Sequence, residues 1–315
     1  MAQHDETVLL IERSKQMYGG TCINVGCLPS KNLILNGQRG LDFTTAVNKR
    51  GEMTRQLRNK NYHMVADEPL ATIWDGSARF IDNYVLAVVM SDGTTKKVRG
   101  ERIFINTGAV PNWPSIPGLE FGQRPNVSSL GLENTDIALT NRGAIQVDDH
   151  LRTTVQNIWA LGDVNGGPMF TYVSLDDFRI IIDQLFGKGD RSTADRMVIP
   201  TASFLNPPLA NVGLNERQAK SAGYNFQTFK LSVKAIPKAR VLEDQRGLYK
   251  VIVDQKTRLI LGATLYAAEA HETINLIALA MKAKLPYERL RDMIYTHPTM
   301  SEALNDLFKT PVVKS

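Results

Sequence analysis

Two cysteines constrain this chain more than any other feature of its sequence. Cys22 and Cys27 are the only cysteines among 315 residues, and both lie in residues 18–31, a glycine-rich turn that leads into a predicted helix. In a reducing compartment such a pair is more often catalytic than structural. A helix N-terminus favours the thiolate form, and the C-x4-C spacing permits a disulfide if the first helical turn is distorted. The pair is therefore a candidate redox dithiol.

Two other interpretations of the cysteines exist. Both can be buried and act as small apolar side chains, and for an isolated C-x4-C spacing this is at least as strong as the catalytic interpretation. A zinc site needs about four ligands, usually from two paired clusters. There is no second cysteine pair, and the histidines are scattered along the chain: His4, His63, His150, His271 and His297. We expect no metal site at these cysteines.

The order of the predicted elements indicates an α/β fold. Residues 7–12 and 102–108 are apolar runs typical of buried parallel strands, and residues 158–163 form a third such run. A polar stretch at 187–196 is typical of a linker, and further strands and helices are expected beyond it. The pattern predicts a mostly parallel α/β unit at 1–190, followed by a smaller α+β unit at 191–315.

Composition and charge exclude several classes of partner. The net charge is +5, and the densest basic run lies within residues 42–63, which have the pattern of one amphipathic helix. A solvated helix face explains this run, and no nucleic-acid motif accompanies it, so we expect no nucleic-acid partner. No apolar run approaches the roughly 20 residues that span a bilayer. Residues 1–7 are polar, so we expect no membrane segment or secretory signal, and a cytoplasmic location.

The residues around the cysteines carry a longer pattern. Residues 19–31, GGTCINVGCLPSK, resemble the redox motif G-G-T-C-x-N-x-G-C-x-P-[ST]-K of the class I pyridine nucleotide–disulfide oxidoreductases. This family includes dihydrolipoyl dehydrogenase, glutathione reductase and mercuric reductase. Residues 153–163 resemble the second flavin-binding motif of the family, and residues 297–302, HPTMSE, resemble its C-terminal acid–base motif. The resemblance implies a partial doubly wound FAD-binding domain at 1–190 and an α+β dimerisation domain at 191–315.

The resemblance implies a role for each matching residue. Cys27 is expected to lie against the flavin, and Cys22 to be the thiol that meets the substrate. Asp163 is expected to bond the ribityl chain of the flavin. Glu12 is expected to hold the adenosine ribose, although a surface acid at the end of a strand is its simpler interpretation. The residues expected to contact FAD are Glu12, Gly20, Thr21, Lys31, Gly108 and Asp163.

His297 and Glu302 are expected to form a general acid–base pair in which the carboxylate orients the imidazole. In the family this pair reaches the dithiol of the other subunit, so the resemblance implies a homodimer. It also implies FAD and NAD(P)H as cofactors and a small oxidised molecule as substrate. A histidine before proline is more often a turn residue when taken alone. His271 lacks such a context and is expected to begin a helix or to lie at an interface.

Three further features resemble the reactive-chlorine-resistance branch of the family: residues 170–179, Tyr18 and residues 305–308. Members of this branch are related to mercuric reductase and are implicated in reducing hypothiocyanous acid, and copper has also been proposed as a substrate. Mercuric reductase usually has a C-terminal cysteine pair that delivers the metal. Residues 309–315 contain no cysteine, so mercury is not expected as the substrate.

Two parts of the family pattern are missing. No G-x-G-x-x-G turn precedes residue 7, where the family has a first FAD-binding unit of roughly 30 residues. Near residue 120 the family inserts an NAD(P)-binding domain of roughly 100 residues. Either the sequence is an incomplete copy of a full enzyme, or the chain lacks both parts and is a truncated, non-enzymatic dimerisation module. A true deletion would leave strands of the flavin sheet unpaired, which favours the first explanation.

Overall fold

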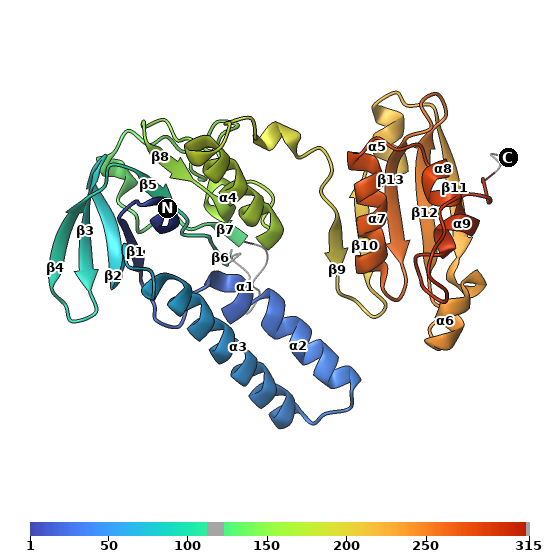
Figure 1. Ribbon diagram of the computed structural model, residues 1–315, viewed down its shortest axis with the longest axis horizontal. Coiled ribbons are helices and arrows are strands. Elements are labelled where there is room, and N and C mark those ends of the chain that lie inside the picture. Colours follow the sequence, from blue (N-terminus) through green and yellow to red (C-terminus); the bar gives the residue numbers. More distant parts are fainter. Residues whose placement is uncertain (112–122, 313–315) are drawn as a thin grey trace. The chain divides into compact units, whose positions relative to one another are not determined.

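The computed structural model describes residues 1–111 and 123–312 and divides into two compact units, Met1–Asp195 and Arg196–Ser315 (Figure 1). The predicted junction near residue 120 lies outside the described residues. Both units combine strands with helices, and the predicted α/β class is confirmed. Within the described ranges, no helix is long and apolar enough to cross a membrane.

A four-stranded sheet forms part of the first unit, in the order β1-β2-β3-β4. Its strands are β1 (Val8–Glu12), β2 (Ala71–Asp82), β3 (Val85–Met90) and β4 (Thr95–Arg99). β1 and β2 are parallel, and the later strands continue as antiparallel neighbours. At the turn between β3 and β4, the Asp92 carboxylate accepts hydrogen bonds from the Thr94 backbone N–H (2.9 Å) and hydroxyl (2.6 Å).

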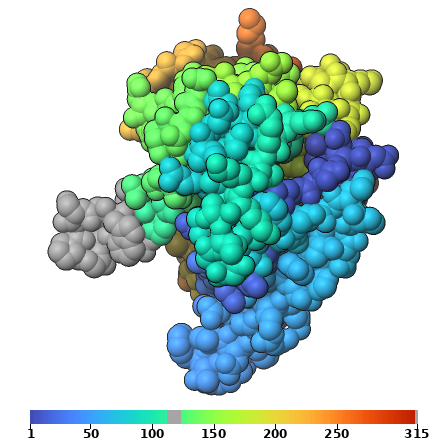
Figure 2. Space-filling model, turned by 90° about the vertical axis from the view of Figure 1, so that its left-hand side faces the viewer, coloured from blue at the N-terminus to red at the C-terminus, as the bar shows by residue number. Residues whose placement is uncertain are grey.

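Three helices connect β1 to β2: α1 (Gly20–Asn24), α2 (Cys27–Gln38) and α3 (Phe43–Ala66). α3 is the predicted amphipathic helix, and the Asp42 side chain caps it by accepting a 3.0 Å hydrogen bond from Thr45 N. The far end of the α2–α3 hairpin extends beyond the sheets of this unit (Figures 1 and 2). A hollow of about 410 Å³ at the hairpin is lined by Leu33, Ile34, Gly37, Leu41, Phe43 and Ala46.

The remaining strands of the first unit form two short pairs. β5 (Ile103–Ile105) and β8 (Ile158–Ala160) are parallel, and β6 (Ala109–Pro111) and β7 (Gln123–Pro125) are antiparallel. α4 (Thr171–Phe186) follows β8. The short 3-10 helices of this unit are η1 (Ala2–His4), η2 (Leu132–Asn134), η3 (Gly162–Asn165) and η4 (Thr193–Asp195). A core that contains Phe80, Ile145 and Ile158 joins these segments.

The strand predicted at residues 7–12 forms, but the prediction that it is buried is wrong. None of the residues of β1 is buried, and Leu10 is 36% exposed. The physical reason is that β1 ends the order of its sheet: in the described ranges it pairs with β2 alone, whereas β5 and β8 form a separate sheet. An apolar sequence buries both faces and both edges of a strand only when it has neighbours on each side.

The second unit is a five-stranded antiparallel sheet, β11-β12-β13-β10-β9, covered by helices. Its strands are β9 (Thr201–Ser203), β10 (Leu209–Gly213), β11 (Phe226–Ser232), β12 (Leu248–Asp254) and β13 (Ile260–Tyr266). Its helices are α5 (Glu216–Ser221), η5 (Val233–Ala235), α6 (Pro237–Val241), α7 (Ala270–Lys282), α8 (Glu288–Arg291) and α9 (Ala303–Leu307). Tyr249, Leu265, Ile277 and Leu304 are fully buried between sheet and helices.

The amphipathic packing of α7 gives a direct test of this core. Ile277 is 0% exposed and Leu279, on the same helix, is 63% exposed. We expect Ile277→Ala to lower the free energy of unfolding by about 2–5 kcal/mol, because it leaves a cavity in the core. The matched control Leu279→Ala should change it by less than about 0.5 kcal/mol. Urea unfolding followed by circular dichroism measures both, and equal effects would contradict the described packing.

Candidate redox-active site

The cysteine pair lies at a break between two helices. Cys22 is in α1, and Cys27 is the first residue of α2. Between them, Val25 (φ −129°, ψ −46°) and Gly26 (φ −97°, ψ −95°) leave helical geometry. Their backbone N–H groups both donate to the carbonyl oxygen of Thr21, at 3.0 and 2.8 Å. The distorted helical turn that a disulfide at this spacing requires is therefore present.

The surroundings of the two sulfurs are unequal. Cys22 is half-buried and Cys27 is exposed, and both are free thiols. Burial raises the pKa of the Cys22 thiol, whereas the hydroxyl of Thr171 lowers it by hydrogen bonding. The neighbouring Cys27 side chain raises the same pKa, and the positive charge of Lys31 lowers it. The structure thus brings Cys22, Cys27 and Lys31 together.

Thr171 belongs to this site and was missed in the sequence. Its Oγ1 lies 3.5 Å from the Cys27 Sγ. It is the first residue of α4, so the positive N-terminal end of a long helix lies at the cysteine pair. A signal for it existed: Thr171 follows a strand that ends in Gly-Asp, and open α/β sheets bind ligands at the carboxyl ends of their strands.

A buried acid on the neighbouring helix binds residues on either side of Asp163. The Asp177 carboxylate, 1% exposed on α4, accepts hydrogen bonds from Gly162 N (2.6 Å) and from Asn165 Nδ2 (3.1 Å). Burial raises the pKa of Asp163, and the negative charge of Asp177 adds to this effect. The Asp163 carboxylate accepts no hydrogen bond within residues 1–111 and 123–312. Sequence reasoning did not find Asp177.

The other residues expected to contact a cofactor lie on turns and strand ends. Glu12 is the last residue of β1, and its side chain accepts a 2.9 Å hydrogen bond from Ser14 N. Thr21 is exposed in α1. Gly20 (φ +78°) and Gly108 (φ +72°) are left-handed, with open space where a side chain would project. Because β5 and β8 are parallel neighbours, Gly108 and Asp163 follow their strands at the same edge of this sheet.

The acid–base candidates form a direct contact in the second unit. His297 Nδ1 lies 2.8 Å from Glu302 Oε2, and Glu302 Oε1 accepts a hydrogen bond from Thr299 N. The side chain of His297 is 68% exposed, whereas that of Glu302 is 18% exposed. A carboxylate fixed at Nδ1 orients the imidazole and leaves its Nε2 to exchange protons. His271 is the second residue of α7, and the centroid of its ring lies 5.2 Å from that of Phe204.

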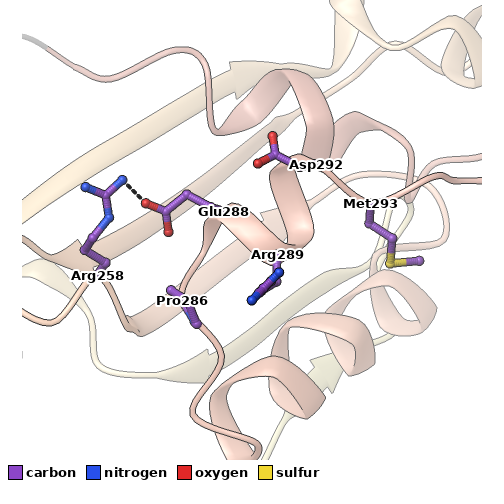
Figure 3. A pocket seen from close by; sticks show the side chains of 6 residues that line it. All are labelled: Arg258, Pro286, Glu288, Arg289, Asp292 and Met293. Carbon is purple, nitrogen blue, oxygen red and sulfur yellow. Dashed lines mark ion pairs between the residues drawn. The ribbon is translucent and has the colours of Figure 1, made fainter.

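A further pocket, of about 450 Å³, contains none of the predicted site residues. It lies in the second unit and is lined by Arg258, Pro286, Glu288, Arg289, Asp292 and Met293 (Figure 3). Arg258 forms an ion pair with Glu288, and Asp292 forms one with Arg291, so much of its charge is neutralised internally. Among the described residues, no group of three or more His, Cys, Asp or Glu side chains could hold a metal ion.

Comparison with known proteins identifies the family. Residues 1–123 and 120–177 match the family described as pyridine nucleotide-disulphide oxidoreductase, and residues 199–308 match its dimerisation domain. The chain belongs to the pyridine nucleotide-disulfide oxidoreductases. Members of this family are enzymes that use FAD and NAD(P)H. The two stretches of the first match meet at 120–123, where the sequence predicts that a domain is missing.

Several individual relatives are similar over most of the chain. The probable pyridine nucleotide-disulfide oxidoreductase RclA of Escherichia coli K12 is 38% identical over 410 residues, which cover 96% of this chain and 93% of the relative. Because 410 exceeds 315, RclA has residues within this alignment that have no counterpart here. Mercuric reductase of Streptomyces lividans is 26% identical, with 95% and 90% covered. Dihydrolipoyl dehydrogenase of Mycobacterium tuberculosis H37Rv is 30% identical, with 82% and 51% covered.

Solved structures agree with this assignment. The HOCl-induced flavoprotein disulfide reductase RclA from Escherichia coli has a TM-score of 0.93 and 37% identity, and the match covers 98% of this chain and 95% of that one. A Cu(II) complex of the same protein gives a TM-score of 0.94, with 98% and 94% covered. The resemblance to a flavoprotein disulfide oxidoreductase is thereby confirmed.

The residues present fit the flavin end of FAD. Asp163 offers a half-buried carboxylate with accepting capacity for hydroxyl groups, and Gly20 and Gly108 leave open space beside the backbone. The fit does not extend to the pyrophosphate. The sequence contains no G-x-G-x-x-G turn, the element whose backbone N–H groups hold that group in dinucleotide-binding folds.

The hydroxyl of Thr171 gives a test of the site's electrostatics. We expect Thr171→Val to raise the pKa of Cys22, because it removes a hydrogen bond that lowers this pKa. The control Thr171→Ser keeps the hydroxyl and should keep the wild-type value. The measurement is the rate of iodoacetamide alkylation of Cys22 against pH, followed by peptide mass spectrometry. Identical pH profiles for the valine variant and the wild type would contradict the contact.

The two neighbouring acids should respond oppositely to neutralisation. The pKa of Asp163 is raised in the folded chain, so the protonated side chain is the form that the fold favours. Its contribution to the stability of the fold is therefore present below its usual pKa and is lost as the pH rises through the raised value. Asp163→Asn should therefore stabilise the flavin-free chain at pH 7 and be neutral in acid. Asp177→Asn should destabilise it at pH 7, because two donors lose a buried carboxylate. Urea midpoints at both pH values measure this, and equal signs at pH 7 would refute it.

Proposed function

We propose that this chain transfers electrons from NAD(P)H to the Cys22–Cys27 pair and on to a small oxidised substrate. The observation that carries the proposal is the pair itself: two thiols at a helix break, beside Thr171 and Lys31. Bound FAD supplies the two-electron relay between the nicotinamide and the pair. In this proposal Gly20, Thr21, Lys31, Gly108 and Asp163 hold the flavin end of FAD, and Glu12 holds the adenosine ribose.

The thiols then act on the substrate in two steps. The Cys22 thiolate attacks an electrophilic atom of the oxidant and forms a mixed bond with it, and a leaving group departs with a proton. The Cys27 thiolate attacks the Cys22 sulfur, which releases the reduced product and leaves a disulfide. Such an attack requires the sulfurs to be close, and the effect of the Cys27 side chain on the pKa of Cys22 supports this. The N-termini of two helices, α2 and α4, lie at the cysteine pair.

His297 is proposed to move the protons of these steps. Its Nδ1 is fixed by Glu302, and its exposed Nε2 can donate to a leaving group or accept from a thiol. A dimerisation domain is present at 199–308, and the proposal is that a homodimer brings His297 of one subunit to the cysteines of the other. A cytoplasmic location stays part of this proposal.

For the substrate we favour a small reactive oxidant such as hypothiocyanous acid. Its electrophilic sulfur suits a thiolate nucleophile, and the balance closes: two thiols and one hypothiocyanous acid give one disulfide, thiocyanate, a proton and water. RclA of Escherichia coli, a relative of this chain, is described as induced by HOCl, another reactive oxidant of this kind. The truncated, non-enzymatic dimerisation module is not favoured, because the relatives are named as enzymes.

Copper(II) is a second candidate substrate, because RclA has been solved as a Cu(II) complex. Thiolates are soft ligands that stabilise copper(I). Oxidation of one dithiol to a disulfide would reduce two copper(II) ions to copper(I) and release two protons. Comparing hypothiocyanous acid with a copper(II) salt, each with a copper(I) chelator present, separates the two substrates.

The function is tested by following NADH and NADPH oxidation with the purified protein and hypothiocyanous acid. We expect a yellow, flavin-containing protein whose turnover is abolished in Cys22→Ser while its flavin absorbance is retained, because no other cysteine can replace Cys22. His297→Gln should lower turnover by about 100-fold or more, the usual contribution of general acid–base catalysis. The control His63→Gln removes a histidine that is exposed on α3.

The outcomes separate the alternatives clearly. A colourless protein that oxidises no NAD(P)H would refute the enzymatic proposal for this chain and favour the truncated module. Full turnover in Cys22→Ser would refute the dithiol mechanism even if the protein is a flavoenzyme. Intact mass spectrometry of the denatured polypeptide, compared with 35.0 kDa, accompanies the assay and establishes which polypeptide was measured.

A further inference from the structure

Asn24 lies between the two cysteines, and its side chain bonds both to the backbone of the preceding turn and to α3. We call residues 18–27 the cysteine loop. Its Nδ2 donates hydrogen bonds to the carbonyl oxygens of Tyr18 (2.9 Å) and Gly20 (2.8 Å). Its Oδ1 accepts a 2.9 Å hydrogen bond from Arg58 Nε. Both amide hydrogens are used, and an arginine can only donate, so the orientation of the Asn24 side chain is fixed by its partners.

Arg58 holds this amide from a distant part of the sequence. It lies on α3, and its Nη1 also donates to Gln16 Oε1, in the turn that follows β1. One guanidinium therefore binds the loop on both sides of the Gly19–Gly20 turn. The fork of donors on a planar guanidinium suits such a two-point contact, whereas a lysine offers a single flexible charge.

Close packing around the turn reinforces the contact with α3. A side chain at Gly19, where φ is +86°, would come within 2.9 Å of Asn61 Cγ and 2.2 Å of Ile23 Cδ1. The ring of Tyr18 meets that of Tyr62 edge-on, with centroids 5.0 Å apart. The tyrosine hydroxyl donates to Asp75 on β2. The loop that carries Cys22 thus packs against α3, and Arg58 contacts Asn24, the residue directly before the helix break.

The position of Asn24 relates this support to the sulfurs. Asn24 is the last residue of α1, and Val25 and Gly26, which follow it, form the break that leads to Cys27. Fixing Asn24 fixes where α1 stops, and hence how Cys22 is presented to Cys27. Two thiols held in place form a disulfide more readily than two thiols on a loose loop, because less freedom is lost on closure.

We propose that Arg58 is a positioning residue for the Cys22–Cys27 dithiol, acting through Asn24 to hold the two sulfurs ready for disulfide formation. This inference rests on the proposed function, in which that disulfide is the working oxidised state. It assigns no contact with substrate to Arg58. It gives the basic residues of α3 unequal roles: Arg58 holds the cysteine loop, whereas Arg55 forms a local ion pair with Glu52 on the same helix.

The experiment is a redox titration of the purified full chain in glutathione buffers. One oxidised glutathione and the dithiol give the disulfide and two reduced glutathiones, and acid quenching, alkylation and mass spectrometry count the remaining thiols. We expect Arg58→Leu to lower the equilibrium constant for disulfide formation by about 10-fold, the size expected for loss of a hydrogen bond to a charged group. Arg58→Lys should lower it less. Arg55→Leu, one helical turn away, should leave it unchanged.

A double-mutant cycle tests whether Arg58 acts through Asn24. Asn24→Ala should lower the constant at least as much as Arg58→Leu, and the double variant should be no worse than Asn24→Ala alone. Fully additive effects would overturn the proposal, and so would an Arg58→Leu variant that behaves like Arg55→Leu. Melting temperatures are measured throughout. If Arg58→Leu does not fold, the comparison is made between Arg58→Lys and Arg55→Lys.

This design separates the inference from the proposed function. A wild-type chain that forms no Cys22–Cys27 disulfide at any glutathione ratio contradicts the proposed function, and the positioning role fails with it. A wild-type chain that forms the disulfide, together with an unaffected Arg58→Leu variant, overturns the positioning role alone.

Discussion

The two hydrogen bonds accepted by the carbonyl oxygen of Thr21 are the constraint on which the rest of the site depends. In a continuous helix this oxygen would receive one N–H, four residues on. Here it receives those of Val25 and Gly26, so α1 can stop and α2 can begin in a new direction without leaving the N–H groups of the break unpaired. Because of this break, Cys27 opens a helix and Cys22 remains in the preceding one.

At that break, two opposing effects act on the ionisation of the sulfurs: nearby positive charge and burial from solvent. The N-termini of α2 and α4 and the charge of Lys31 favour an anionic sulfur, whereas the burial of Cys22 opposes it. A similar opposition occurs after the end of β8, where burial and the neighbouring carboxylate of Asp177 raise the pKa of Asp163. In both places ionisation is made less favourable at a residue that is proposed to act in the site. Side chains with shifted pKa values are concentrated at the active sites of enzymes.

Contiguous features of the site could be predicted from the sequence, and contacts between distant segments could not. The cysteine motif, the long helix α3 and the contact between His297 and Glu302 each depend on residues that are close in the chain. Thr171 meets Cys27 across 144 positions, and Arg58 meets Asn24 across 34. The Gly-Asp strand end pointed to the region of Thr171, but its contact with Cys27 and that of Arg58 with Asn24 depend on the packing of α4 and α3. The exposure of β1 could not be predicted from its apolar composition. That composition shows that a strand is suited to burial, but it does not show how many strands pair with it. The roles of the matched residues stay predictions.

The position of β1 has a consequence for handling the protein. In the described ranges this apolar strand is paired only with β2, so its second edge presents backbone N–H and C=O groups with no partner strand. Such an edge is a template on which a strand of another polypeptide can add, and natural proteins usually guard theirs with charges, prolines or bulges. Val8, Leu9, Leu10 and Ile11 offer none of these, and the only charge within β1 is that of Glu12 at its end. Concentrated solutions of the flavin-free chain are therefore expected to aggregate through intermolecular β-pairing at this edge.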